Sequence, residues 1–247
     1  MSVAKIRADV LLVSRGLAPS RERARAYILA GKVFRGEQRV DKAGEKLAED
    51  TVLTVRGVDH PYVSRGGVKL EGALDSFGWQ VDDVVAADFG ASTGGFTDCL
   101  LQRGAARVFA IDVGYGQLHP RLRSDPRVVV MERTNARYVK LEDLGAPVNL
   151  VVIDASFIGL EKLLPAVRAI LAPGGRVLAM VKPQFQVGKG EVGKGGVVRD
   201  PEKRRGAIQA VADAAKALGF DIEGQADAAI KGPKGNHEAF LALRLPA

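Results

Sequence analysis

Cysteine is nearly absent from the sequence: Cys99 stands alone, so no disulfide bond can form within the chain. The three histidines lie far apart, so the ligand spacing of a metal site is missing and we expect no bound metal. No apolar run approaches the ~20 residues of a membrane helix, and Lys5, Arg7 and Asp9 interrupt any apolar stretch of the signal-peptide type. These absences predict a soluble cytoplasmic protein with no membrane segment.

Acidic charge is scarce in the first quarter of the chain. Residues 1–57 carry twelve Lys and Arg against seven Asp and Glu, which accounts for +5 of the net charge of +7. Basic side chains that neutralise phosphates release counterions and so bind nucleic acid whatever its sequence. The asymmetry favours an acidic polymer as partner, and simple solubility is the alternative interpretation.

The first 57 residues are expected to form two short helices and then a strand-rich portion. The first helix ends at Gly16, whereas the second begins after Ser20, which is placed to cap it, and ends at Gly31. Residues 27–29 are expected to face inward. Short strands are expected around residues 33–34, 39–40 and 52–55.

Basic residues gather on the second of these helices. Arg21, Arg23 and Arg25 fall on the polar part of its start, and Lys32 and Arg35 follow shortly after it. A charged helix face is commonly a solvated surface, so RNA contact and plain solvation both stay open for these residues taken alone.

A linker is expected after this portion, because Asp59, His60 and Pro61 stand among glycines. We therefore divide the chain into a small first domain at 1–57, a linker at 58–67 and a larger domain at 68–247. Ser64 can cap a helix that extends through about Phe77, with Lys69 beside its apolar stripe.

The larger domain alternates between apolar strands and helices. Strands are expected at VVAAD, RVFAID, VVVM, NLVVID and RVLAMVK, and helices before and between them, including LEKLLPAVRAIL and GAIQAVADAAKALG. A final antiparallel hairpin is expected near residues 226–230 and 238–245. This alternation predicts an α/β, Rossmann-like fold with a parallel sheet covered on both faces.

The turn after the first of these strands has the composition of a nucleotide-binding loop. In DFGASTGGF the glycines stand at Gly90, Gly94 and Gly95, where they let the backbone approach a ligand and leave the N–H groups of the following helix available. A dinucleotide fingerprint reads G-x-G-x-x-G, which this spacing does not match. The turn therefore predicts a nucleoside-containing cofactor without a pyrophosphate.

Acids and amides follow the ends of four strands, namely Asp88, Asp112, Asn135 and Asp154. Asp112 lies 22 residues after Gly90, close to the ~20 at which an acid binds ribose hydroxyls in such sheets. Asp88 can hold N–H groups of the loop or meet a ligand amine. Each of them can instead form turns and cap helices, the ordinary role of Asp and Asn.

S-adenosylmethionine suits this layout, because it combines adenosine, ribose and a zwitterionic amino acid with no phosphate. The expected cofactor-binding residues are the turn and the strand-end side chains: Asp88, Gly90, Ser92, Thr93, Gly94, Gly95, Phe96, Asp112 and Asn135.

The ordered motifs resemble the FtsJ-type ribose 2′-O-methyltransferases. They are SRGGVKL, DFGASTGGFTDCL, AIDVG, VVIDASF, MVKPQFQ and NHEAFLAL. The preceding helices and GKVFRGEQRV resemble an S4-type RNA-binding module. Together, over essentially the whole chain, these segments resemble the hemolysin A or TlyA family of ribosomal RNA methyltransferases.

The resemblance implies a catalytic set of Lys69, Asp154, Lys182 and Glu238. A ribose hydroxyl is a poor nucleophile, so its proton must be removed or its developing negative charge stabilised during in-line attack on the methyl group. Lys182 is the candidate for that contact, with Lys69 as a neighbouring cation and the two acids orienting the ammonium groups. Which lysine gives up its proton stays open at this point, as does an ordinary ion-pair role for each residue alone.

The resemblance also implies a cytidine of ribosomal RNA in assembled subunits as the target. The candidate RNA contacts are basic: Arg21, Arg23, Arg25, Lys32, Arg35, Arg65 and Lys189. One feature departs from the family pattern: Ser92-Thr93 stands where many FtsJ-type chains have proline. The resemblance also implies that the linker helps to couple RNA and cofactor binding, and Tyr62 occupies the place where the linker is expected to carry an aromatic residue. The loop of residues 188–205 can close on RNA or be an ordinary surface loop.

Two other functions compete with methyl transfer. A ribosome-assembly factor could keep the fold without turnover, against which stands the complete four-residue set. A membrane-lytic protein is suggested only by the hemolysin name, and the sequence offers no membrane segment for it. The sequence leaves the oligomeric state and the modified subunit open.

Overall fold

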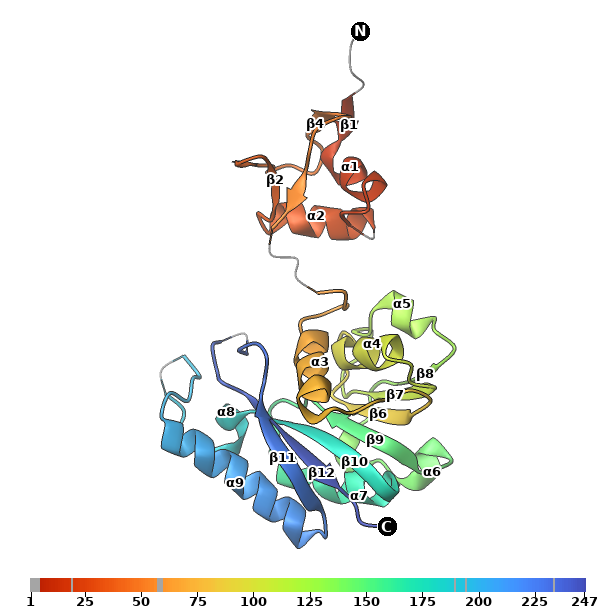
Figure 1. The fold of residues 1–247 in the computed structure, drawn as a ribbon, viewed down its shortest axis with the longest axis vertical. Helices are drawn as coiled ribbons and strands as arrows, with labels where there is room; N and C mark the ends of the chain where they lie inside the picture. Colours follow the sequence, from red (N-terminus) through yellow and green to blue (C-terminus); the bar gives the residue numbers. More distant parts are fainter. Residues whose placement is uncertain (1–4, 19, 57–59, 189, 194, 233) are drawn as a thin grey trace. The chain divides into compact units, whose positions relative to one another are not determined.

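The computed structural model describes residues 5–18, 20–56, 60–188, 190–193, 195–232 and 234–247. The chain divides into two compact units, Met1–Asp59 and His60–Ala247 (Figure 1). Tyr62 is buried in the core of the second unit, so part of the segment expected as a linker packs with that unit.

The first unit is a small α+β structure. Its elements are β1 (Lys5–Arg7), α1 (Ala8–Ser14), α2 (Arg21–Leu29), β2 (Val33–Arg35), β3 (Gln38–Arg39), β4 (Lys46–Ala48) and β5 (Thr54–Val55). Strands β1 and β4 pair with each other, and β2 lies between β3 and β5. Ser20 caps α2 as expected, since its side chain accepts a hydrogen bond from the Arg23 N–H.

One expectation for this unit was wrong, and two of its strands were missed. Leu29 is 89% exposed rather than inward-facing, because the inner face of α2 is supplied by Ala24, Tyr27 and Ile28. Strands β1 and β4 were not expected, because each is only three residues long and carries charged residues that obscure the alternation.

The second unit is built on a seven-stranded sheet in the order β11-β12-β10-β9-β6-β7-β8 (Figure 1). Its strands are β6 (Val85–Phe89), β7 (Arg107–Ile111), β8 (Val128–Met131), β9 (Val148–Ile153), β10 (Leu171–Val181), β11 (Asp221–Asp227) and β12 (Ala239–Arg244). Strand β12 runs antiparallel to both of its neighbours, and the other pairings within this sheet are parallel. The expected α/β, Rossmann-like class is confirmed.

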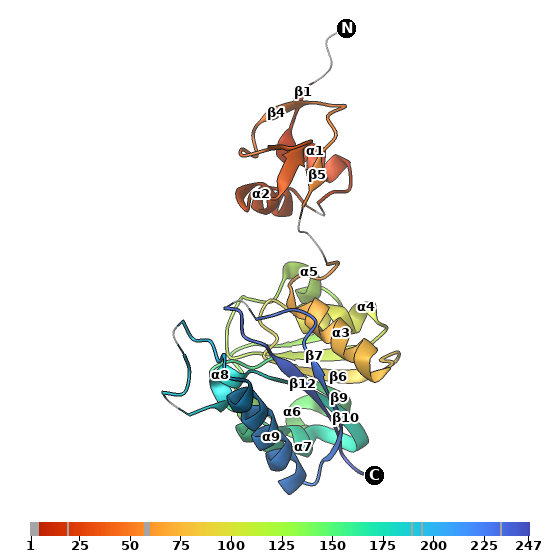
Figure 2. The same ribbon diagram turned by 60° about the vertical axis from the view of Figure 1, so that its left-hand side comes forward.

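Helices cover both faces of this sheet. They are α3 (Gly66–Phe77), α4 (Gly95–Gln102), α5 (Pro120–Arg123), η1 (Ala136–Tyr138), α6 (Leu141–Leu144), η2 (Leu160–Lys162), α7 (Leu164–Ile170), α8 (Pro183–Gln186) and α9 (Pro201–Ala217). Side chains alternate along each strand between the two faces. Ala87 and Phe89 of β6 therefore pack on the side of α7 and α9, whereas Ala86 packs on the side of α3 and α4. Figure 2 shows α3 and α4 on one side of the sheet and α7 and α9 on the other.

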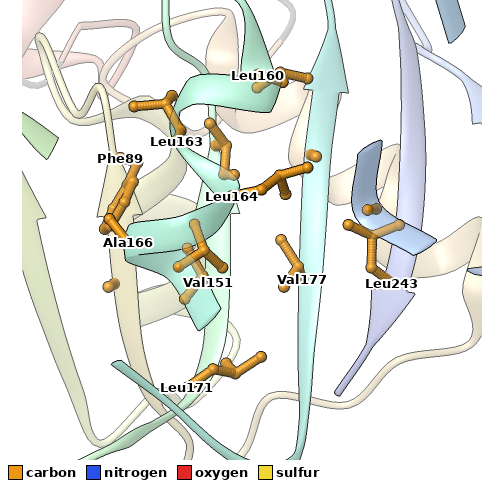
Figure 3. Packing of buried hydrophobic residues seen from close by; sticks show 14 of the residues in the cluster. Phe89, Val151, Leu160, Leu163, Leu164, Ala166, Leu171, Val177 and Leu243 are labelled. Carbon is orange, nitrogen blue, oxygen red and sulfur yellow. The ribbon is translucent and has the colours of Figure 1, made fainter. Parts of the chain in front are cut away.

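The α7 side of the core is dense with aliphatic residues. Leu163 and Leu164 lie over the sheet with Phe89, Val151 and Val177, all of them buried (Figure 3). This packing fixes the strands whose carboxyl ends carry the site.

The structure moves some expected boundaries. The last hairpin begins at Asp221 rather than near residue 226, because the alternating edge strand DIEGQAD exposes every second residue and contains Gly224, next to a register shift. The helix expected over LEKLLPAVRAIL is divided into η2 and α7, and Pro165 stands at the start of α7, where a missing N–H costs least.

Candidate active site

A cavity of about 600 Å³ lies at the carboxyl ends of β6, β9 and β10. From β6 the chain continues to β7 and β8 on one side and returns to β9 and β10 on the other, so the strand order reverses beside β6. Open α/β sheets bind their ligands at such a point. The expected site residues that line the cavity are Arg65, Lys69, Gly90, Ser92, Thr93, Gly95, Phe96, Asp154, Lys182 and Glu238.

The glycine turn between β6 and α4 forms one wall. Gly90 has a φ of +90°, and a Cβ there would stand 2.9 Å from the backbone oxygen of Asp154. Thr93, Gly95 and Phe96 line the cavity, and within the described part of the chain their backbone N–H groups donate no hydrogen bond. Unpaired N–H groups at a helix start suit an anionic group, so this wall fits a ligand carboxylate.

Asp88 lies behind the turn, fully buried, and does not line the cavity. Its Oδ2 accepts hydrogen bonds from the Thr97 N–H at 3.0 Å and from the Thr97 hydroxyl at 2.7 Å, which fixes the first turn of α4. Burial raises the pKa of Asp88 to about 7, against the opposing hydrogen bonds from Thr97. Of its two expected roles, the geometry shows the holding of backbone N–H groups, although on the helix rather than on the loop.

Asp112 and Asn135 also hold backbone. The Asp112 carboxylate accepts from the N–H of Ser92 at 2.8 Å and from the N–H of Gly114 at 2.7 Å. Asn135 caps η1 by accepting from the N–H of Arg137 at 3.1 Å. Neither residue lines the cavity, so a ribose contact by Asp112 stays a prediction.

Lys69 and Glu238 meet on one side of the cavity as a buried ion pair. Lys69 Nζ, on α3, lies 2.5 Å from Glu238 Oε2, just before β12. Their side chains are 8% and 2% exposed. The sequence separates these two residues by almost the whole domain, and the sheet brings them together.

Lys182 and Asp154 form a second ion pair at the ends of β10 and β9. Lys182 Nζ lies 2.5 Å from Asp154 Oδ1 and donates to Ser156 Oγ at 2.8 Å and to the Asp154 backbone oxygen at 3.2 Å. Partial burial raises the pKa of Asp154, while Lys182 and Lys69 oppose the rise and Glu238 adds to it. The arrangement places two ammonium groups, each oriented by a carboxylate, against one cavity, where they can stabilise a developing oxyanion.

Several lining residues were not expected from the sequence, although they stand inside the quoted motifs. Ser156 and Phe157 stand two and three residues after Asp154 in VVIDASF, and Phe185 stands three residues after Lys182 in MVKPQF. Phe157 has a φ of +66°, is 91% exposed and packs against Phe185 with ring centroids 5.1 Å apart. An exposed aromatic residue with a strained backbone at a cavity suggests a functional role. The sequence alone shows only an apolar residue in a loop, so this role could not be predicted from it.

The expected RNA contacts of the first unit are partly engaged within the protein. Arg21 and Arg25 bind Asp9, and Arg23 donates to the Tyr27 hydroxyl. Arg35 pairs with Glu45 and donates to Gln38. Lys32 is half-buried before β2, where its N–H donates to the Tyr27 oxygen.

In the second unit, the Arg65 guanidinium donates to the backbone oxygen of Lys231 at 2.8 Å at the cavity wall. Lys189 lies outside the described residues. Basic residues near α9 are paired with acids, as in the ion pairs Lys203–Glu191, Arg204–Asp227 and Arg205–Glu202. Their charge is therefore partly neutralised within the protein.

Two features are absent from the described residues. None of the helices in that part of the chain is long and apolar enough to cross a membrane. No group of three or more His, Cys, Asp or Glu is arranged there to hold a metal ion.

The fold, the glycine turn and the four charged residues define a class of protein, the Rossmann-like methyltransferases. Residues 62–245 match the FtsJ-like methyltransferase family, and residues 6–53 match the S4 domain. The chain therefore belongs to the FtsJ-like methyltransferase family and carries an S4 domain ahead of the enzyme domain.

The chain is similar to named proteins over most of their length. The chain is 49% identical to the 16S/23S rRNA (cytidine-2′-O)-methyltransferase TlyA of Mycobacterium tuberculosis, over 97% of this chain and 90% of that protein. It is 38% identical to hemolysin A of Brachyspira hyodysenteriae, over 96% and 98% of the two chains. The solved structure of a candidate hemolysin from Streptococcus thermophilus superposes with a TM-score of 0.77 at 42% identity, covering 99% of this chain and 90% of that one.

Proposed function

We propose that this protein transfers a methyl group from S-adenosylmethionine to the 2′-hydroxyl of a cytidine in ribosomal RNA within ribosomal subunits. The observation that carries the proposal is the convergence of Lys69, Asp154, Lys182 and Glu238 on one cavity beside the glycine turn. The names of the TlyA relatives support the ribose, the cytidine and the ribosomal target.

The cavity residues fit S-adenosylmethionine. The free N–H groups of Thr93, Gly95 and Phe96, which line the cavity, would hold the methionine carboxylate. Asp112 directly follows β7 and does not line the cavity, and its contact with the ribose hydroxyls is part of the proposal. The bound cofactor supplies an electrophilic methyl carbon. No metal is required by this donor set, which consists of backbone N–H groups, lysines and carboxylates.

Lys182 is the residue that we assign to the attacking oxygen. Asp154 and Ser156 hold its ammonium group in place, and Lys69, held by Glu238, adds a second positive charge to the same cavity. Negative charge that develops on the 2′-oxygen during attack is stabilised by these preorganised cations. Alternatively, Lys182 is the base: its nitrogen takes the hydroxyl proton as the 2′-oxygen attacks, and the carboxylate of Asp154 stabilises the ammonium formed.

Phe157 supports an RNA substrate rather than a small molecule. A base taken out of an RNA stack is commonly held on an aromatic side chain. Phe157 lines the cavity, is exposed and rests on Phe185, so it offers such a face next to Lys182.

The S4 domain would bind the surrounding RNA, and a ribosomal substrate implies a cytoplasmic location.

The domain limits of 1–57, 58–67 and 68–247 are part of the proposal. The compact units divide after Asp59, and the two family matches span residues 6–53 and 62–245.

The test is incubation of the purified protein with methyl-labelled S-adenosylmethionine and unmodified ribosomal subunits, followed by nuclease digestion and mass spectrometry of the nucleosides. We expect label in 2′-O-methylcytidine. Label on a base would remove the ribose mechanism, and cofactor binding without product on either subunit would favour a non-catalytic assembly factor.

The assigned role of Lys182 is tested in the same assay. Lys182→Ala is expected to abolish transfer while cofactor affinity, measured by calorimetry, changes less than about threefold. The exposed residue Lys162 gives a matched control, since Lys162→Ala removes the same charge and chain length away from the cavity. Unchanged turnover in Lys182→Ala would contradict the assignment.

A further inference from the structure

The first unit contains a carboxylate surrounded by three arginines. Asp9, the second residue of α1, is fully buried. Its Oδ1 accepts from Arg7 Nε at 2.9 Å, and its Oδ2 accepts from Arg7 Nη2 at 3.0 Å, Arg25 Nε at 3.1 Å and Arg21 Nη2 at 3.3 Å. One side chain thereby connects β1, α1 and the first half of α2.

The carboxylate and the arginines differ sharply in exposure. The side chains of Arg7, Arg21 and Arg25 are 43%, 53% and 57% exposed, whereas Asp9 is 0% exposed. Arg21 and Arg25 each donate to Asp9 through one guanidinium nitrogen. The other guanidinium N–H groups of these two arginines do not donate to Asp9. The cluster therefore presents guanidinium groups to solvent around a concealed anion.

The surroundings preserve room for this cluster. Gly44 lies against Arg7, and a Cβ at that position would stand 3.3 Å from Arg7 Nη1. The three guanidinium groups hold the pKa of Asp9 far below its ordinary value, in opposition to its burial. Asp9 is consequently ionised at neutral pH.

We propose that Asp9 is a positioning residue that fixes Arg7, Arg21 and Arg25 as one binding site for RNA backbone phosphates. Ordering long side chains before binding removes part of the entropic cost of association. Arginine suits the task because its planar fork can bind one anion along one edge and a second along another. The inference rests on the RNA substrate of the proposed function.

Replacing Asp9 distinguishes the positioning role from simple electrostatics, because the two predict opposite changes in RNA affinity. Asp9→Asn raises the net positive charge by one, so charge alone predicts tighter RNA binding. Loss of the positioned cluster predicts weaker binding. The matched control is Glu37→Gln, which makes the same change of charge in the same unit, at a carboxylate that is 91% exposed and paired with Arg56.

The experiment measures dissociation constants of the full chain for an unmodified ribosomal RNA fragment over a series of salt concentrations. We expect Asp9→Asn to raise the constant about tenfold and to make its salt dependence shallower, while Glu37→Gln leaves it unchanged or lowers it. In the methyl-transfer assay the KM for RNA rises with little change in kcat. An unchanged or lower dissociation constant for Asp9→Asn would overturn the proposal.

A second pair of variants covers the case in which Asp9→Asn fails to fold. Arg25→Lys keeps the charge at an exposed position but loses the Nε–H that donates to Asp9, so we expect RNA binding to weaken about threefold or more. Arg39→Lys, at the exposed pair with Asp41, is the control and should bind as the original chain does. Equal binding by both variants would refute the positioning role, whereas failure of the original chain to bind or methylate any ribosomal RNA would instead refute the proposed function.

Discussion

Lys69 and Glu238 form a buried ion pair with 2.5 Å between Nζ and Oε2, although 169 residues separate them in the sequence. The pair joins α3 to the entrance of β12 and borders the cavity. It therefore contributes to the stability of the domain and to the arrangement of the candidate active site.

This ion pair gives a prediction for a double-mutant cycle. Lys69→Met alone leaves the buried Glu238 carboxylate without its partner, and Glu238→Gln alone leaves the buried Lys69 ammonium without its partner. Either change typically costs about 3–5 kcal/mol of the free energy of unfolding. The double variant should cost clearly less than the two together, as measured by urea unfolding. The exposed pair Arg39–Asp41 is the control, with an expected coupling below about 1 kcal/mol. Additive effects at Lys69 and Glu238 would contradict the buried pair.

Asp88 gives a prediction for stability against pH. Its folded-state pKa is raised to about 7 from an ordinary value of 3.8, so the folded protein binds the proton more tightly than the unfolded chain does. The contribution of Asp88 to the free energy of unfolding is therefore full below about pH 4, falls as the pH rises towards 7 and is lost above pH 7. The pKa shift corresponds to a few kcal/mol of this free energy.

Urea unfolding between pH 5 and 8 checks this sign. Asp88→Asn should remove the part of the decline that is due to Asp88, while the raised pKa of Asp154 acts equally in both proteins. Asp125→Asn is a control of opposite sign, since the hydrogen bond from Arg127 lowers the pKa of Asp125 and its stabilisation is lost only below that range. The same slope in Asp88→Asn and in the original chain would contradict the prediction.

Gly94 gives a prediction for the glycine turn. Its φ is +94°, and a Cβ would stand 2.2 Å from Leu122 Cδ1 and 2.8 Å from Leu118 Cδ1. Gly94→Ala should therefore destabilise the domain by about 2–4 kcal/mol through overpacking and strain, and it should weaken binding of S-adenosylmethionine at least tenfold by moving the turn. Calorimetric titration and urea unfolding measure the two effects.

Gly145 provides the matched control for that substitution. It has a φ of +79° but no heavy atom within 4 Å of a Cβ, so Gly145→Ala carries the backbone strain alone. It should cost about 1 kcal/mol and leave cofactor affinity unchanged. Comparable losses of cofactor affinity at both glycines would show that the packing of Gly94 is not the cause.

Phe157 gives a prediction for the RNA substrate. Stacking of a base on an aromatic side chain contributes about 1–3 kcal/mol, so Phe157→Ala should lower kcat/KM for RNA roughly 5- to 100-fold. Cofactor affinity and stability should change little, because the side chain is 91% exposed. Phe157→Tyr keeps the ring and should retain most of the activity. Full activity of Phe157→Ala would remove the stacking role.

Sequence patterns predicted the parts of the fold that depend on neighbours along the chain. The capping of α2 by Ser20, the strand-to-helix turn at Gly90 and the alternation of strands and helices all follow from local spacing. Very short or irregular elements were harder to predict from the sequence, because β1 spans three residues and the edge strand β11 has a register shift. Leu29 was wrongly expected inside, since an apolar letter next to Ile28 does not reveal which face of a short helix is covered.

The sequence by itself determined that the first strand of the sheet ends in a glycine turn, that acids follow the strands and that the basic charge concentrates in the first domain. Only the tertiary structure decided which of these groups meet: Lys69 with Glu238, Lys182 with Asp154, and Asp9 with three arginines. The reason is that periodicity and capping act over a few residues, whereas these pairs depend on the order of the strands and on burial. Burial also decided which carboxylates hold the backbone, as Asp88 does, and which face the cavity, as Asp154 does.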